Sequence, residues 1–155
     1  MIRTISLKKL IPSILLPLFT GLLANIFTSN AKAVYSNLLK PPVSPPSIVF
    51  PFIWTLLYIL IGVSIYLVED SYCDKKRSRQ SYAVLLGLNL LWPIIFFTLQ
   101  WYAVAVVIIF LMLASAVISI YYFYNCDKNA GFLLLPYLIW LVYSTYLNIG
   151  VVALN

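Results

Sequence analysis

The sequence contains no histidine, and its 155 residues include only two cysteines, Cys73 and Cys126. Without histidine, no conventional Cys/His zinc site can be assembled and no imidazole can act as a general base. Charged residues are also scarce: they make up 9% of the chain, against about 25% in a typical soluble domain. These absences exclude an ordinary soluble domain, a zinc centre and histidine-based catalysis, and we expect no metal ion.

Hydrophobic residues are abundant instead. They make up 63% of the chain, and the mean hydropathy is +0.99. About 20 consecutive apolar residues cross the hydrocarbon of a bilayer as one helix, and runs of this length use most of the chain. We therefore predict an all-α integral membrane protein, a single transmembrane domain over residues 1–155. Its five helices are expected over about 10–28, 48–68, 81–98, 101–124 and 131–153.

Residues 29–47 form a long connector that contains the proline-rich stretch Lys40 to Pro46. Prolines lack a backbone donor and push the preceding residue out of the α region, so we expect this connector to be non-helical and stiff. Its length for so small a bundle predicts a functional lid. Residues 71–80 are rich in charge and are expected to form a solvated loop.

The first apolar run, Leu10 to Phe27, has two interpretations. Basic residues precede it and Ala31-Lys32-Ala33 follows, an order that resembles a cleavable secretory signal. The run is nevertheless longer than the usual signal core of about 7–15 residues. It also contains Gly21 and Asn25, which suit packing between helices. We favour a retained first helix.

The basic residues predict an orientation. Eight of the ten fall on the side of the N-terminus, and only Lys32 and Lys40 fall on the other. The eight are Arg3, Lys8, Lys9, Lys75, Lys76, Arg77, Arg79 and Lys128. By the positive-inside rule, the N-terminus is cytoplasmic in a bacterial inner membrane and the connector faces outward. We interpret these charges as contacts with lipid headgroups rather than with nucleic acid. Cys73 and Cys126 then lie in the cytoplasm, where we expect them to stay reduced.

The predicted spans carry no ionised side chain at mid-depth, which argues against ion pumping or proton relay. Three spans instead carry amides, hydroxyls and aromatic rings at helical spacing. These are Trp54 and Tyr58; Asn89, Trp92 and Phe96; and Tyr137, Trp140 and Ser144. Two interpretations stay open. The residues line a ligand pocket, or they form interfacial belts and interhelical hydrogen bonds that only stabilise the bundle.

Four stretches of the sequence resemble the TspO/MBR family, which includes tryptophan-rich sensory proteins and the mitochondrial translocator protein, or peripheral-type benzodiazepine receptor. They occur in the order and spacing of the family and cover nearly the whole chain. The stretches are Tyr35 to Pro46, Pro51 to Tyr58 with Gly62, Leu88 to Phe97, and Pro136 to Trp140 with Leu147-Asn148.

The resemblance implies a five-helix bundle that often dimerises and requires no cofactor. It further implies an interhelical pocket that binds sterols, benzodiazepine-type compounds and porphyrins, such as protoporphyrin IX or heme. The connector roofs this pocket in the family. The matching positions, together with the aligned residues above, are Tyr35, Pro41, Pro45, Trp54, Tyr58, Asn89, Trp92, Phe96, Tyr137, Trp140, Ser144 and Asn148.

Three functions follow as hypotheses. We favour a membrane protein that binds, and transports or senses, tetrapyrroles and related hydrophobic ligands. The second hypothesis is an enzyme that degrades porphyrin photo-oxidatively. By resemblance, its redox-active candidates are Trp54 and Trp140, which match tryptophans implicated in this reaction in some bacterial members. The third is a purely structural membrane protein without a small ligand, whose partners lie in the lipid bilayer.

Overall fold

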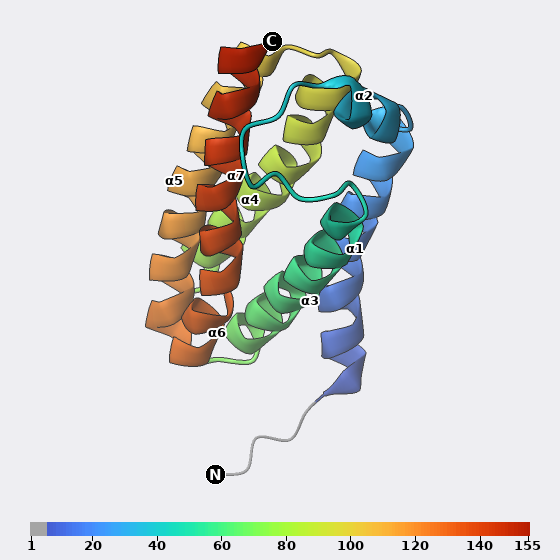
Figure 1. Cartoon of the computed structure of the whole chain (residues 1–155). Helices are drawn as coiled ribbons and strands as arrows, with labels where there is room; N and C mark the ends of the chain where they lie inside the picture. The colour runs from blue at the N-terminus through green and yellow to red at the C-terminus, as the bar shows by residue number, and fades with distance from the viewer. Residues whose placement is uncertain (1–5) are drawn as a thin grey trace.

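The computed structural model describes residues 6–155, and within them every regular element is a helix. The elements are α1 (Leu7–Phe27), α2 (Ala31–Asn37), α3 (Val49–Glu69), α4 (Lys76–Pro93), the π-helical turn η1 (Ile94–Thr98), α5 (Tyr102–Cys126), α6 (Lys128–Leu133) and α7 (Leu135–Leu154). Among these residues, five helical segments are long and apolar enough to cross a membrane: α1, α3, α4 with η1, α5, and α6 with α7. The predicted five-helix membrane bundle is confirmed (Figure 1).

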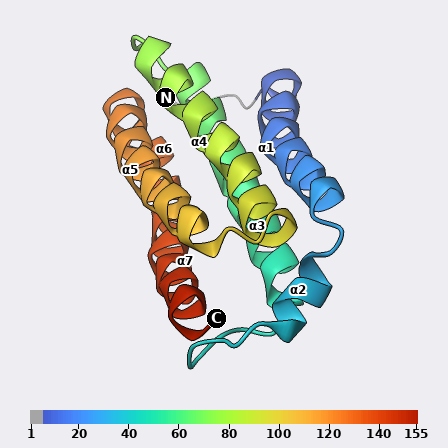
Figure 2. The same ribbon diagram turned by 90° about the horizontal axis from the view of Figure 1, so that it is seen from above.

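The spans run side by side, and their ends gather into two groups (Figures 1 and 2). The start of α1, the α3–α4 loop and the α5–α6 junction lie at one end, here called the basic end. The short helix α2, the α4–α5 turn and the C-terminus lie at the other, the connector end. Helix α1 packs on α3 and α4, and α5 packs on α4, α6 and α7. Helices α3 and α7 touch only sparsely, so a gap between them remains to be covered.

Glycine permits the close approach of α1 and α3. A Cβ atom at Gly62 would lie 2.5 Å from the Cα of Ile14 and 2.7 Å from the carbonyl oxygen of Ser13. Both neighbours are backbone atoms, so no side-chain rotation relieves the contact. Small residues commonly let membrane helices approach in this way, because packing rather than the hydrophobic effect holds helices together in lipid.

Large apolar side chains cover the outer surfaces of the bundle. On α1, Leu15, Phe19 and Leu22 are more than half exposed, and on α5 so are Val107 and Phe110. In water these surfaces would favour aggregation, whereas in a bilayer they face acyl chains of matching polarity. The apolar exterior therefore agrees with the membrane assignment.

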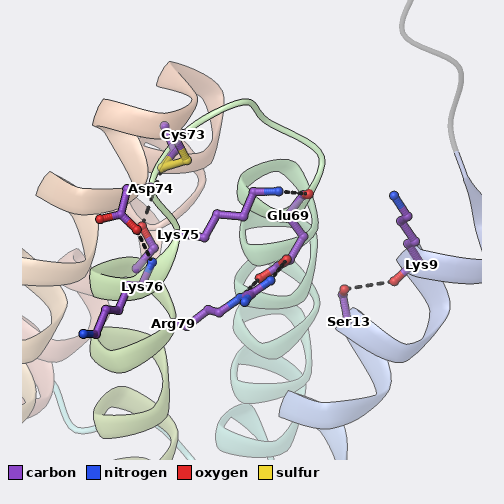
Figure 3. A network of polar contacts seen from close by, with 10 residues as sticks. Lys9, Ser13, Glu69, Cys73, Asp74, Lys75, Lys76 and Arg79 are labelled. Atoms are coloured by element: carbon purple, nitrogen blue, oxygen red, sulfur yellow. Dashed lines mark hydrogen bonds and ion pairs between the residues drawn. A yellow bond between two sulfur atoms is a disulfide. The ribbon is translucent and has the colours of Figure 1, made fainter.

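Two expectations about the connecting segments were wrong. The connector contains a helix, α2, because its prolines begin only at Pro41 and leave Ala31–Asn37 free to be helical. The predicted loop 71–80 is also half helical, because α4 begins at Lys76. There the side chain of Arg79 binds the Glu69 carboxylate through two hydrogen bonds of 2.6 Å, which link the start of α4 to the end of α3 (Figure 3).

The last span is interrupted at Leu134, which separates α6 from α7. Pro136 follows in the first turn of α7, where proline is well tolerated because that turn needs no intrahelical donor. The Asp127 carboxylate caps α6 by accepting hydrogen bonds from the backbone N–H groups of Asn129 and Ala130. The single helix expected over residues 131–153 is thus two helices.

The expectation that the cysteines stay reduced was also wrong, because Cys73 and Cys126 form a disulfide. Helices α4 and α5 are antiparallel neighbours, so the loop before α4 meets the last residue of α5 at the basic end. The sulfur atoms are drawn there in Figure 3. This proximity is a tertiary contact that the separation of the two cysteines along the sequence does not indicate. Arg3, which contributed to the charge count for this end, lies outside the described residues.

Candidate functional site

A chamber lies in the gap between α3 and α7, and α4 with η1 and α5 completes its wall. It encloses about 540 Å³ of space not occupied by atoms, part of it open to solvent. Its surface is mostly apolar, and the chamber is narrow. The lining residues are Tyr35, Lys40, Pro41, Ser44, Phe50, Trp54, Trp92, Phe96, Phe97, Ile109, Met112, Leu141, Ser144, Leu147, Asn148 and Val151.

One aromatic wall is built around the π-helical turn that follows Pro93. The rings of Trp92 and Phe96 stack at 5.2 Å between centroids, and Phe97 meets Phe96 edge to face at 4.8 Å. The wider turn of a π-helix changes the direction in which successive side chains point. Phe96 and Phe97, although adjacent in sequence, both line the chamber. A local departure from α-helical geometry therefore shapes the wall.

Helix α7 provides the polar part of the wall. The Asn148 side chain accepts a 3.1 Å hydrogen bond from the Trp92 indole N–H and donates a 2.8 Å bond to the Ser144 carbonyl. These bonds fix the Trp92 ring against the chamber and join α4 to α7. An interior with a few oriented polar groups among aromatic rings is typical of small-molecule sites.

The chamber floor is supported by a second polar pair. The Asn89 amide donates hydrogen bonds to the Tyr137 hydroxyl at 2.8 Å and to the Leu85 carbonyl at 2.7 Å. Both Asn89 and Tyr137 are buried, and neither lines the chamber. Tyr58 also lies below it, with its ring 5.6 Å from that of Trp54. These residues position the wall rather than forming it.

The connector roofs the chamber. The hydroxyls of Tyr143 and Tyr146 on α7 donate hydrogen bonds of 2.6 and 2.9 Å to the carbonyls of Val43 and Pro42. Val43 has a φ of 65°, an unusual conformation for a β-branched residue, and its bond to Tyr143 helps to hold it. Pro41 rests on Gly150, where any Cβ atom would collide with the proline ring.

Tyr35 closes the roof from the α2 side. Its hydroxyl donates a 2.6 Å hydrogen bond to the Pro45 carbonyl, and its ring meets Phe50 edge to face at 5.2 Å. Burial, and to a lesser extent the neighbouring phenol of Tyr143, raises the pKa of Tyr35. The phenol therefore stays protonated at neutral pH and keeps its proton for the bond to Pro45.

The structure brings together seven of the twelve predicted site residues on the chamber surface: Tyr35, Pro41, Trp54, Trp92, Phe96, Ser144 and Asn148. The other five, Pro45, Tyr58, Asn89, Tyr137 and Trp140, do not line it. Trp140 lies behind Phe50, at 6.0 Å between ring centroids, and its buried indole N–H has no hydrogen-bond partner among the described residues. Of the two candidate redox-active tryptophans, only Trp54 reaches the chamber.

Several residues that line the chamber were not predicted from the sequence. Phe50 lies one turn before Trp54, and Leu141 and Val151 continue the helical face of Ser144 and Asn148, so the spacing contained a usable signal. Ile109 and Met112 had no such signal. Helix α5 is apolar on nearly every face, and such a pattern does not indicate which side points inward.

These features define a class: multi-pass membrane proteins with an aromatic cavity between the helices and a connector folded over it. The sequence profile described as the TspO/MBR family matches residues 13–154. The tryptophan-rich protein TspO of Archaeoglobus fulgidus is 36% identical over 97% of this chain and 99% of its own length. The tryptophan-rich sensory protein of Cereibacter sphaeroides is 35% identical over 78% and 76%. The human translocator protein is 34% identical over 74% and 70%. The chain belongs to the TspO/MBR family and is an integral multi-pass membrane protein.

Proposed function

We propose that this protein binds porphyrins, and comparable flat hydrophobic ligands such as sterols, in the chamber between α3 and α7. The observation that carries this proposal is the aromatic wall of Trp54, Trp92 and Phe96 under a roof attached by side-chain hydrogen bonds. Flat ring systems gain binding free energy by stacking against such a wall. A mostly apolar surface also favours ligands that already partition into lipid.

The roof suits a site that exchanges its ligand. The chamber is narrow, so a rigid macrocycle requires the connector to move outward before it enters. The roof is held to α7 by individual hydrogen bonds from Tyr143 and Tyr146 rather than by a covalent bond. Relatives are named translocator protein and sensory protein, and reversible loading of one site is compatible with either use.

Trp54→Phe tests the proposal. Losing the larger ring from the wall removes stacking worth about 0.5–1.5 kcal/mol, so the dissociation constant of protoporphyrin IX is expected to rise several-fold. The change in porphyrin absorbance on titration measures binding without depending on tryptophan emission. Trp101→Phe is the matched control, because Trp101 is exposed at the α4–α5 turn and does not line the chamber. Equal losses of porphyrin affinity in both variants would show that the ligand does not bind in the chamber.

We also propose that the N-terminus faces the cytoplasm when the chain is inserted in a bacterial inner membrane. The excess of basic residues at the basic end carries this proposal. The Cys73–Cys126 disulfide lies at the same end. Disulfides persist mainly in oxidising compartments, so the bond favours the opposite orientation, and the two orientations predict opposite labelling patterns.

Labelling with a membrane-impermeant maleimide decides the orientation. In a Cys73→Ser/Cys126→Ser background, Leu39→Cys places a thiol at the connector end and Tyr72→Cys places one at the basic end. Both positions are exposed. In intact spheroplasts we expect labelling at position 39 only, with position 72 labelled after permeabilisation. The reverse pattern would place the disulfide on the oxidising side and refute the assignment from charge.

A further inference from the structure

A second hollow adjoins the chamber at the connector end. It is a shallow surface depression between α2 and the rest of the connector, with Ser29, Lys32, Ser36, Lys40 and Ser47 among its lining residues. Tyr35 and Lys40 line both the depression and the chamber, so the two spaces meet at these side chains. A molecule that fills the apolar chamber and extends outward therefore reaches a polar surface beside Lys40.

The charge of this surface has one sign. Among residues 6–155, Lys32 and Lys40 are the only charged residues that line the depression, and Lys40 is the only one that lines the chamber. The four acidic side chains of the sequence are Glu69, Asp70, Asp74 and Asp127, all of which belong to the opposite, basic end. No carboxylate side chain at the connector end competes for the two lysines.

The Lys40 ammonium is held in a defined place. It donates hydrogen bonds of 2.9 Å to the carbonyl oxygens of Tyr35 and Leu38, and it lies 4.9 Å from the centre of the Tyr35 ring. An ammonium group has three N–H donors, so one remains for a further acceptor. A fixed cation loses less conformational freedom on binding than a mobile surface lysine would.

We propose that the ligand is an anionic amphiphile: its apolar body occupies the chamber, and a carboxylate accepts a hydrogen bond from Lys40. Lys32, which is exposed on α2, adds long-range attraction at the depression. This inference rests on the proposed function, and it narrows the ligand class to compounds with an acidic group at one edge. A neutral sterol offers Lys40 only its uncharged hydroxyl as an acceptor, whereas a porphyrin that carries carboxylates offers an anionic one. Bonds of this charge-assisted kind are about twice as strong as those between neutral groups.

Two forms of one macrocycle test the inference: protoporphyrin IX and its dimethyl ester, which differ in charge and share the ring. Lys40→Gln is expected to weaken binding of the free acid about five- to tenfold and to leave the ester nearly unchanged. Lys40→Arg retains the charge and is expected to restore most of the affinity. Lys76→Gln at the basic end is the matched control and is expected to change neither affinity.

Ester binding also reports whether each variant is folded. Wild-type protein that binds neither compound refutes the proposed function itself. Equal affinity for acid and ester, or equal losses for both in Lys40→Gln, leaves that function intact and overturns the carboxylate contact.

A lipid phosphate has related chemistry, so the titrations are repeated in nanodiscs of phosphatidylcholine with and without phosphatidylglycerol. Acid binding that is independent of phosphatidylglycerol supports the ligand carboxylate. Competition by phosphatidylglycerol that disappears in Lys40→Gln assigns the site to a lipid headgroup and overturns the inference.

Discussion

Gly62→Leu is expected to separate α1 from α3 and to destabilise the bundle by about 3 kcal/mol or more. Overpacking a fitted interface costs about 1–3 kcal/mol when side chains can adjust. Here the added atoms meet the Cα of Ile14 and the carbonyl of Ser13, so the whole of α1 must move. The free energy of unfolding in mixed micelles, measured by titration with a denaturing detergent, gives the loss.

Gly87→Leu is the matched control for this variant. Gly87 lies on α4 and is exposed, and no atom lies within 4 Å of the position that its Cβ would occupy. The same substitution there is expected to be neutral or slightly stabilising, because leucine favours helix more than glycine does. Similar stabilities for Gly62→Leu and Gly87→Leu would contradict the close contact between α1 and α3.

Ser144→Phe is expected to abolish most porphyrin binding while leaving the bundle folded. Ser144 lies on the chamber surface between Leu141 and Asn148, and a phenyl ring at this position fills the narrow space that the ligand requires. We expect the dissociation constant of protoporphyrin IX to rise at least tenfold, equivalent to about 1.4 kcal/mol. An absorbance titration of the porphyrin measures it.

Two variants separate occlusion from other effects of the change at Ser144. Ser144→Ala removes the hydroxyl without filling the chamber. The proposed binding rests on stacking against the aromatic wall and not on this hydroxyl, so the affinity is expected to stay within about twofold of wild type. Val142→Phe adds the same ring on the exposed face of α7 and is expected to leave binding unchanged. A Ser144→Phe protein that is thermally stable and binds with wild-type affinity would place the ligand elsewhere.

The membrane fold was predictable because an apolar run of helical length has few alternatives in lipid. Smaller features were not. Helix α2 is too short to produce a clear periodic pattern, and α4 extends into a charged segment because Arg79 pairs with Glu69 on the neighbouring helix. The Cys73–Cys126 bond likewise depends on the loop before α4 meeting the end of α5 in space. Each of these features is set by tertiary contacts that the local sequence does not contain.

The site was predictable where polar or aromatic residues recur on one face of a helix. Trp92 and Phe96 on α4 and η1, with Ser144 on α7, were singled out on this basis, and they line the chamber. The same reasoning did not distinguish the lining from the layer behind it. Asn89 and Tyr137 share those faces, but their hydrogen bond closes the floor beneath the chamber. Whether a side chain on such a face lines the chamber or lies beneath it depends on how the neighbouring helices cross. The spacing of residues along the sequence does not indicate this crossing.

The proposed ligand occupies the space between α3 and α7, and its location can be measured directly. Crystals grown with zinc protoporphyrin contain one strong anomalous scatterer per bound ligand, so a diffraction data set collected at the zinc absorption edge locates the macrocycle. We expect a peak inside the chamber, near Trp54, Trp92 and Ser144. A peak on the lipid-facing surface, with the chamber still closed by the connector, would contradict the claim.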